Sequence, residues 1–371
     1  MTSFQKFLKN IFGSKKETPI NYNQLIRQHL KILKKLQTKS GLFLASNSNV
    51  KTGYDKAWLR DNFYECIAFE VLNDWSTVKR TYGAILEVFK KHEYKIDYAI
   101  LKKPEYTHQY IHARYNPETF DEFWEEWGNK QNDSIGCILF KIGELESVKK
   151  IKILEDENDY RIVQKLVDYL STLEYWHDPD SGMWEENQEI HASSVGACLA
   201  GLKMIRNVGG IKVSGELIKK GEEVLNRLLP RESQKKFVDL ALLSLIWPYN
   251  VVDKKQGDEI LKNVEYHLVR KRGVIRYKGD HYYNKNSDNF SEEAEWTFGF
   301  SWLALIYEML GKVNKAESFM KREMKDTTKE GIPELYFSNS DKYNENTPLG
   351  WSESLFITAL YYINKKRMKE E

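Results

Sequence analysis

The sequence predicts an all-α protein built as an (α/α)6 barrel, a closed ring of helical hairpins around a central funnel. Apolar residues recur at helical spacing from end to end, whereas β-like alternation is short and scattered. Short turns such as "NDWS" and "LGKV" join many of the expected helices, which favours αα-hairpins. No repeat with a fixed period of about 34–47 residues is present, which argues against an open solenoid of stacked helix pairs.

About twelve helices follow from this periodicity. Their expected ranges are residues 22–37, 61–72, 76–91, 132–150, 158–175, 191–206, 213–229, 238–246, 254–270, 292–310, 313–324 and 350–366. The longer connections hold much of the chain's Trp, Tyr, His and paired acids; they are 41–60, 95–131, 176–190, 271–291 and 325–349. In a ring of hairpins these connections can share one rim, and loops on such a scaffold are where binding and chemistry concentrate.

The composition is that of a folded globular protein without a strongly charged surface. Of 371 residues, 41% are hydrophobic and 30% are charged, far from the disordered regime. Lys plus Arg number 56 and Asp plus Glu 54, so the chain has no overall basic field of the kind that captures nucleic acid, and no nucleic-acid partner is expected. No Pro-, Gly- or Ser-rich linker divides the chain, which predicts one domain, residues 20–371, after a short extension, residues 1–19.

The three cysteines, Cys66, Cys137 and Cys198, are far apart and form no CxxC pair. A sparse set without metal-ligand spacing predicts buried free thiols in a reducing compartment, the cytoplasm, and no metal site. No run of about eighteen apolar residues occurs, so a membrane-spanning helix is not expected.

The first residues, "MTSFQKFLKNIFGSKK" (1–16), form a basic amphipathic segment with Phe, Leu and Ile on one helical face. This segment lacks the continuous apolar core and the cleavage signal of a secretory peptide. Two interpretations stay open: weak contact with an anionic membrane surface or a partner protein, or a first helix packed on its own domain.

The connection "GYDKAWLRDNFYE" (53–65) places Trp58, Arg60 and Asp61 just ahead of a predicted helix. Arg60 and Asp61 are close enough in sequence to form a local ion pair. Alternatively, they present donors and acceptors to a polyhydroxylated ligand.

The next connection, "FWEEWGNKQNDSIG" (123–136), contributes Trp124, Trp127 and Asp133. Asp133 lies near a helix start. A capping role explains it about as well as a role in binding.

The remaining long connections repeat this combination of aromatic rings with carboxylates, amides or arginines. They carry Trp184, Glu185 and Glu186 in "GMWEE", Arg276 and Tyr277 in "GVIRYKGDHYYN", and Glu334 and Trp351 in "GIPELYFSNSDKYNENTPLGWSESL". Sugars have apolar faces on which aromatic rings stack, and hydroxyl edges that bond to Asp, Arg and Gln. The repetition therefore favours a funnel that binds carbohydrate.

Two of these acids suit the hydrolysis of a glycosidic bond, which needs one protonated carboxyl group and one ionised carboxylate. Glu185 is the candidate acid, because a neighbouring indole and the like charge of Glu186 both favour a protonated carboxyl group. Glu334 is the candidate second carboxylate, since it comes from a separate loop, as opposite faces of one bond require. Competitors for that second role are Glu292, Glu293 and Glu295.

At these residues the sequence resembles glycoside hydrolase family 15, the glucoamylase family. The segments that carry the resemblance occur in the family's order between residues 53 and 360; they are "WLRDN", "WGNKQNDSIG", "GMWEE", "IHASSVGACLAGL", "GVIRYKGDHYY", "AEWTFG", "GIPEL" and "PLGWSESL". Each segment is weak alone, and the ordered set is specific. The stretch "EIHASSVG" is especially similar to the glucoamylase-like domains of phosphorylase kinase regulatory subunits.

The resemblance implies an (α/α)6 barrel that releases glucose from the non-reducing ends of α-glucans with inversion of configuration. By position it implies Glu185 as general acid and Glu334 as the general base that activates water. The residues implied to hold the terminal glucose or to line its pocket are Arg60, Asp61, Trp127, Trp184, Glu186, Arg276 and Trp351. Leu335 departs from the family, which often has glutamine after the base. No metal or organic cofactor is implied.

The leading interpretation is an exo-acting α-glucosidase of malto-oligosaccharides or glycogen fragments. Trehalase or dextran-type specificity stays open, because linkage preference depends on the loops that shape the pocket. A non-catalytic module that binds glucan and regulates a partner is the alternative of a different class. The presence of both carboxyl groups favours the enzyme.

Overall fold

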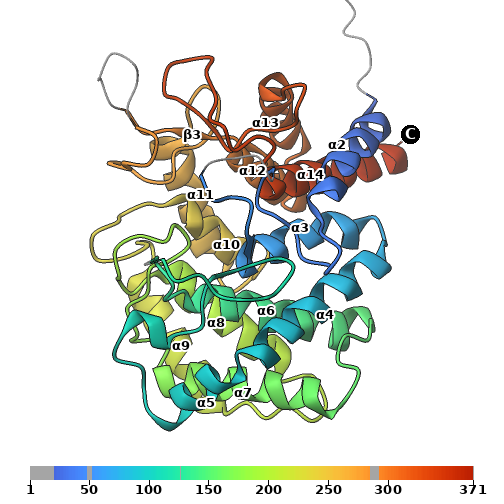
Figure 1. Ribbon diagram of the computed structural model, residues 1–371. Coiled ribbons are helices and arrows are strands. Elements are labelled where there is room, and N and C mark those ends of the chain that lie inside the picture. Colours follow the sequence, from blue (N-terminus) through green and yellow to red (C-terminus); the bar gives the residue numbers. More distant parts are fainter. Residues whose placement is uncertain (1–20, 48–51, 126, 285–291, 371) are drawn as a thin grey trace, which may run out of the picture.

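The computed structural model describes residues 21–47, 52–125, 127–284 and 292–370 (Figure 1). The predicted extension, residues 1–19, lies outside the described residues. Within them, six helices form an inner ring, in which each packs against the next and the last packs against the first. In ring order they are α3 (Leu59–Val71), α6 (Asn132–Glu144), α8 (Ala192–Ile205), α10 (Leu243–Ile246), α12 (Phe298–Met309) and α14 (Gly350–Glu370).

Each inner helix has an outer partner among the described elements. In the same order the partners are α4 (Trp75–Lys91), α7 (Glu157–Leu173), α9 (Gly215–Leu228), α11 (Lys254–Leu268), α13 (Val313–Asp326) and α2 (Tyr22–Leu36). One further helix, α5 (Glu93–Leu101), packs on α7. Figure 1 shows that α2, from the first part of the described chain, lies beside α14 from its last part, so these two helices form one inner–outer pair.

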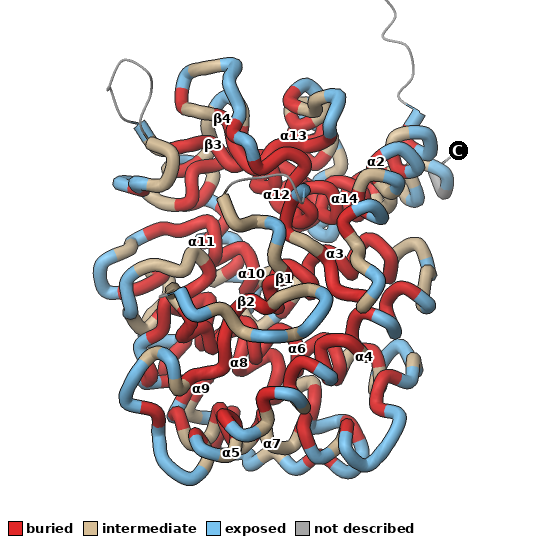
Figure 2. The backbone as a smooth tube through the Cα atoms, viewed as in Figure 1, coloured by how far each residue is buried: buried red, intermediate tan, exposed pale blue. Residues whose placement is uncertain are grey.

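Burial explains which helices are inside. Almost every residue of α3, α8 and α12 is buried, and for α8 and α12 this is expected of helices that are apolar on all sides. The outer helices α2, α9 and α11 bury one stripe and expose charged residues on the other face. Figure 2 shows the same division, with buried backbone at the centre and exposed backbone at the periphery.

Most outer helices begin at side-chain caps, although α13 does not, and several inner helices lack such a cap. Polar side chains accept a backbone N–H at the starts of α2, α4, α7, α9 and α11; they are Asn21, Asp74, Asp156, Ser214 and Asp253. By contrast, Trp58, Gln131 and His191 stand at the N-cap positions of α3, α6 and α8 and make no capping bond. The first of these lines the cavity described below.

Glycine allows the closest approach between inner helices. A Cβ atom added at Gly136 of α6 would lie 2.5 Å from the carbonyl carbon of Ala197 in α8. A methyl group does not fit there, so the α6–α8 contact depends on glycine.

Three sequence predictions differ from the structure. The helix expected over 292–310 begins at Phe298, because β3 (Glu295–Trp296) pairs antiparallel with β4 (Leu335–Tyr336) instead. The connection expected over 95–131 includes part of α5, and the helix expected over 238–246 starts as a 3-10 turn, Leu240–Leu242, before α10. Pro248, which has no backbone N–H, then prevents α10 from continuing.

A second short sheet joins β1 (Ala57–Trp58) antiparallel to β2 (Arg114–Tyr115). Both sheets hold segments that lead into the N-termini of inner helices. In the described part of the chain, none of the helices has the length and hydrophobicity needed to cross a membrane.

Candidate active site

A cavity lies at the end of the inner ring where α3, α12 and α14 begin. Its free space, opening included, is about 450 Å³. The side chains around it come from six separate segments; they are Ala45, Tyr54, Trp58, Arg60, Asp61, Met183, Trp184, Glu185, Arg276, Trp296, Glu334, Leu349 and Trp351. Acids, arginines and indoles therefore face one space.

Glu185 enters the cavity from the loop before α8. Its backbone is in the left-handed region, with φ of +62°, which is uncommon for a residue other than glycine and occurs where a loop must aim a side chain. Its carboxylate accepts hydrogen bonds from Trp127 Nε1 at 2.5 Å and Gln131 Nε2 at 2.9 Å, and Arg60 Nη2 lies 3.3 Å away. These donors fix the carboxylate in one orientation.

Glu334 enters the same cavity from the loop after α13, just ahead of β4. The residue is 1% exposed, and its carboxylate accepts from Tyr54 Oη at 2.8 Å, Asn346 Nδ2 at 2.8 Å and Asn344 Nδ2 at 2.5 Å. Burial raises the pKa of Glu334 above its ordinary value, and the three hydrogen bonds oppose that shift. The donors come from segments far apart in the chain, since Tyr54 lies 280 residues from Glu334 in sequence.

Arg60, the second residue of α3, is held from behind by α6. Its guanidinium donates to Gln131 Oε1 at 2.8 Å and to Asp133 Oδ2 at 3.1 Å. Burial disfavours its charge, but Asp133 and Glu185 outweigh burial, so the pKa of Arg60 lies above its usual value. Its ion pairs are with these two acids, so the local pair with Asp61 that the sequence allowed is not formed.

Asp61 forms part of the cavity floor. Burial raises its pKa to about 7, with Glu185 and Glu334 adding to the shift and Arg60 opposing it. Glu65 lies one helical turn further along α3, and neither of its carboxylate oxygens has a hydrogen-bond partner among the described residues. Burial and the proximity of Asp61 raise the pKa of Glu65 well above its ordinary value.

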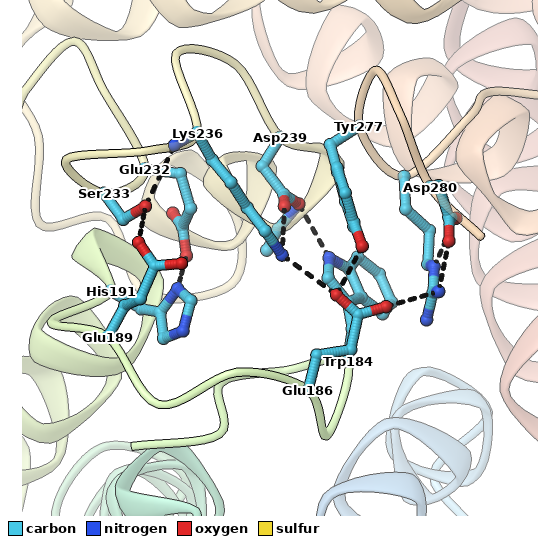
Figure 3. Close-up of polar contacts among 12 residues, drawn as sticks. Trp184, Glu186, Glu189, His191, Glu232, Ser233, Lys236, Asp239, Tyr277 and Asp280 are labelled. Atoms are coloured by element: carbon cyan, nitrogen blue, oxygen red, sulfur yellow. Dashed lines mark hydrogen bonds and ion pairs between the residues drawn. The ribbon is translucent and has the colours of Figure 1, made fainter. Parts of the chain in front are cut away.

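Glu186 belongs to a polar cluster with Tyr277, Lys236 and Asp280 (Figure 3). It accepts from Tyr277 Oη at 2.5 Å and from Arg276 Nη2 at 2.8 Å, and Lys236 Nζ lies 3.2 Å away. Adjacent in sequence, Glu185 and Glu186 therefore bind different partners.

The same cluster fixes Arg276 and Trp184. Asp280 binds Arg276 in two places, at Nε (2.7 Å) and Nη2 (2.6 Å), and the Arg276 guanidinium lies over the indole of Trp184, 5.3 Å from its centre. Asp239 accepts from Trp184 Nε1 at 2.7 Å. Burial raises the pKa of Asp239 to about 6, and Lys236 opposes that shift.

An aromatic wall closes the inner end of the cavity. Trp351 stacks on Phe298 at 4.8 Å and on Tyr64 at 4.2 Å between ring centres. Trp302 packs against the same indole at 5.9 Å. These rings fill the interior of the barrel, so the space ends there.

Trp127 stands at the opening. Its Nε1 binds Glu185, and the guanidinium of Arg114 covers its ring at 3.8 Å. Arg114 is itself buried and pairs with Glu125 at 2.9 Å. The indole is therefore held in place on one face and at its nitrogen.

The structure brings most of the predicted site residues to this cavity. Those that line it are Trp58, Arg60, Asp61, Trp184, Glu185, Arg276, Glu334 and Trp351. Trp127 and Glu186 line the adjoining opening together with Tyr282 and Tyr283. Asp133 and Tyr277 lie behind it, where they hold Arg60 and Glu186; Asp133 is not the α6 cap, which is Gln131.

Sequence reasoning missed several residues of the cavity. Tyr54 and Trp296 are the most important, because one binds Glu334 and the other adds an indole to the wall. Both belong to quoted motifs, "GYDKAWLRD" and "AEWTFG", so aromatic content was the available signal. The competing acids Glu292, Glu293 and Glu295 bind Ser338, Gly279 N and Arg272 N, outside the cavity lining.

The described residues contain no group of three or more His, Cys, Asp and Glu side chains placed to hold a metal ion. The chemistry that the cavity residues themselves can perform is proton transfer between carboxyl groups and a ligand. Arginine and indole N–H groups add hydrogen bonding, and the rings add stacking.

Comparisons with known proteins agree with this architecture. A family model described as "Glycosyl hydrolases family 15" matches residues 21–371. In sequence the chain is similar to the probable phosphorylase b kinase regulatory subunit alpha of Caenorhabditis elegans, with 24% identity over 84% of this chain and 31% of that protein. The chain thus spans about a third of the length of this curated relative.

Solved structures are similar to the whole described ring. A glycosidase in complex with glucose is 17% identical, with a TM-score of 0.78 over 92% of this chain and 97% of that chain. A bacterial glucoamylase complexed with acarbose is 16% identical, with a TM-score of 0.70 over 93% of this chain and 56% of that chain. These similarities confirm the predicted (α/α)6 fold class.

Proposed function

The chain belongs to family 15 of the glycosyl hydrolases, and from that premise we propose that it is an inverting, exo-acting α-glucoside hydrolase. Its proposed substrates are malto-oligosaccharides or glycogen fragments, from whose non-reducing ends it releases glucose. The observation that carries the proposal is that Glu185 and Glu334, from separate loops, line one cavity together with arginines and indoles.

Glu334 is the proposed general base. An inverting hydrolase activates a water molecule with a carboxylate on the face of the sugar opposite the leaving group. Tyr54, Asn344 and Asn346 all donate to Glu334, and such donors stabilise the ionised form that a base requires.

Glu185 is the proposed general acid. When it gives its proton to the leaving oxygen it becomes a carboxylate, and charge-assisted hydrogen bonds stabilise that product. Trp127, Gln131 and Arg60 are placed to supply them. The inverting assignment also requires that the two carboxyl groups lie roughly 6.5–9.5 Å apart, to leave room for water.

The shape of the cavity supports attack at chain ends. Because Tyr64, Phe298 and Trp302 fill the barrel behind Trp351, a chain cannot pass through, and only a terminal sugar can enter. Hydroxyl groups of that sugar are proposed to bind the charged groups of the cavity, and its apolar face to stack on the indoles. The charged groups are Arg60, Asp61 and Arg276.

A second candidate function is a non-catalytic module that binds glucan and regulates a partner. The similarity to a probable phosphorylase b kinase regulatory subunit favours it. Both functions require that glucan binds in the cavity, but only the enzyme hydrolyses it. We also propose a cytoplasmic location, supported by the free and buried Cys66, Cys137 and Cys198.

The test compares the unaltered protein with Glu185→Gln and Glu334→Gln variants on maltose, maltotriose, isomaltose, trehalose and glycogen. Release of glucose from maltotriose is expected, and each variant is expected to lower kcat by about 10²–10⁴-fold or more, the usual value of general acid or base help. Binding without turnover in the unaltered protein would instead support the regulatory module. Preferred hydrolysis of trehalose or isomaltose would change the proposed glycosidic linkage that the enzyme cleaves, but not the proposed roles of Glu185 and Glu334.

A further inference from the structure

A second hollow lies beside the candidate active site, between α5 and the loop that follows it. Its free space, opening included, is about 1540 Å³. Three of its lining residues are exposed aromatics: Trp124, whose surface is fully exposed, with Tyr94 and Tyr106. None of these has a role in the chemistry proposed above. We call this hollow the α5 groove.

The α5 groove is continuous with the active site through shared side chains. A shallow depression lined by Thr107, Trp127 and Glu185 connects the two. Thr107 and Trp127 also line the α5 groove, and Glu185 also lines the catalytic cavity. The α5 groove therefore adjoins the indole of Trp127, whose nitrogen binds Glu185, the proposed acid.

Two buried polar atoms in the groove have no hydrogen-bond partner among the described residues. They are His112 Nε2 and Asn129 Oδ1. His112 Nδ1 accepts from the backbone N–H of Arg114 at 3.0 Å, and burial lowers the pKa of His112 to about 3. His112 is thus neutral with its hydrogen on Nε2, so the groove offers one free donor and, at Asn129, one free acceptor.

The charged residues of the groove are already paired. Lys95 binds both carboxylate oxygens of Glu122 at 2.8–2.9 Å, and Glu125 pairs with Arg114. Asp121 pairs with a lysine of α4. What remains for a ligand is aromatic surface with a neutral donor and acceptor, which suits a neutral polyhydroxylated molecule better than an ion.

We propose that the α5 groove binds the part of an α-glucan chain that extends out of the active site on its reducing-end side, with Trp124 as the principal stacking ring. This inference rests on the proposed function for the direction of the chain. It adds a binding site outside the cavity, so that long chains are held at two places and short ones at one. The enzyme then prefers long chains over maltotriose.

The experiment measures the dissociation constants of maltotriose and maltoheptaose by calorimetry in a Glu185→Gln background, which prevents turnover. Trp124→Ala is compared with Tyr266→Ala, which removes another exposed ring, on α11. Trp124→Ala is expected to lower the preference for maltoheptaose about tenfold, the order of magnitude for uncovering one stacked ring. Tyr266→Ala is expected to leave the preference as it was.

An unchanged preference in Trp124→Ala, or no binding of maltoheptaose in the background protein, overturns the inference. Hydrolysis of maltotriose by the unaltered protein is scored separately. If turnover is absent and Trp124→Ala still lowers the preference, the groove stands and the proposed activity falls. If turnover is present and the preference is unchanged, the activity stands and the groove falls.

Discussion

The hydrogen bond from Tyr54 to Glu334 offers a sharp test of which residue is the base. Tyr54→Phe keeps the ring and removes one of the three donors to Glu334. Since these donors stabilise the ionised carboxylate, their partial loss must raise the pKa of Glu334 further above its ordinary value, in the direction in which burial already shifts it.

The expected size of the shift follows from the energy of one hydrogen bond. A bond to a charged group contributes about 1.5–3 kcal/mol, and one pKa unit corresponds to about 1.4 kcal/mol. Because two donors remain and the carboxylate can adjust to them, the lower end of this range applies. The pKa of Glu334 is therefore expected to rise by about one unit.

The assay is the pH dependence of kcat/KM with maltotriose, which has no ionisable group. The limb on the acid side reports the protonation of the base in the free enzyme. Activity is lost as the pH falls through the pKa of Glu334, so a higher pKa moves this limb to higher pH by about one unit. Tyr282→Phe is the matched control, because the Tyr282 hydroxyl binds Tyr54 but is not bonded to Glu334.

The reasoning is refuted if the melting temperature of Tyr54→Phe is unchanged and the acid limb of its pH profile stays in place or moves to lower pH. An equal shift in Tyr282→Phe refutes it too, because the effect then belongs to the surroundings and not to the bond with Glu334.

Three further predictions concern the acid, the polar cluster and the ring. Trp127→Phe removes the indole donor to Glu185 and should lower kcat about 10- to 100-fold, since it removes one charge-assisted hydrogen bond from the carboxylate formed in the reaction; an unchanged kcat contradicts it. Lys236→Met leaves the buried carboxylate of Asp239 without its cation. Chemical denaturation should show that the free energy of unfolding falls by about 3–5 kcal/mol. An unchanged free energy of unfolding contradicts the stabilising role of the Lys236–Asp239 pair. Gly136→Ala should lower the free energy of unfolding by at least about 1–3 kcal/mol. Gly83→Ala in α4, where nothing lies within 4 Å of the added Cβ, should raise it by up to about 1 kcal/mol, and equal effects of the two changes would contradict the close contact of α6 and α8.

The sequence was sufficient to predict the fold class because helical periodicity is a local property. Inner helices such as α8 and α12 are apolar on all sides, and outer helices such as α9 carry one apolar stripe, so each reveals its layer within one segment. The predicted start of α12 was wrong because local periodicity does not report contacts with distant segments. Residues 292–297 have helical spacing, and the pairing of β3 with β4, distant in sequence, overrides it.

The candidate site was predictable in part. The residue types and the loops were visible, because acids and aromatic rings recur in each long connection. The partners of each acid were not visible, because they are set by contacts between distant segments: Tyr54 reaches Glu334 across 280 positions, and Trp127 reaches Glu185 across 58. The separate partners of Glu185 and Glu186 were not visible either, although the two residues are adjacent in sequence.

The measurement that tests the central claim most directly is the anomeric form of the first glucose released. Proton NMR of the unaltered protein with maltotriose, recorded before mutarotation, is predicted to show β-glucose, because a water activated by Glu334 attacks from the face opposite the oxygen protonated by Glu185. Release of α-glucose, or of no glucose at all, contradicts the account.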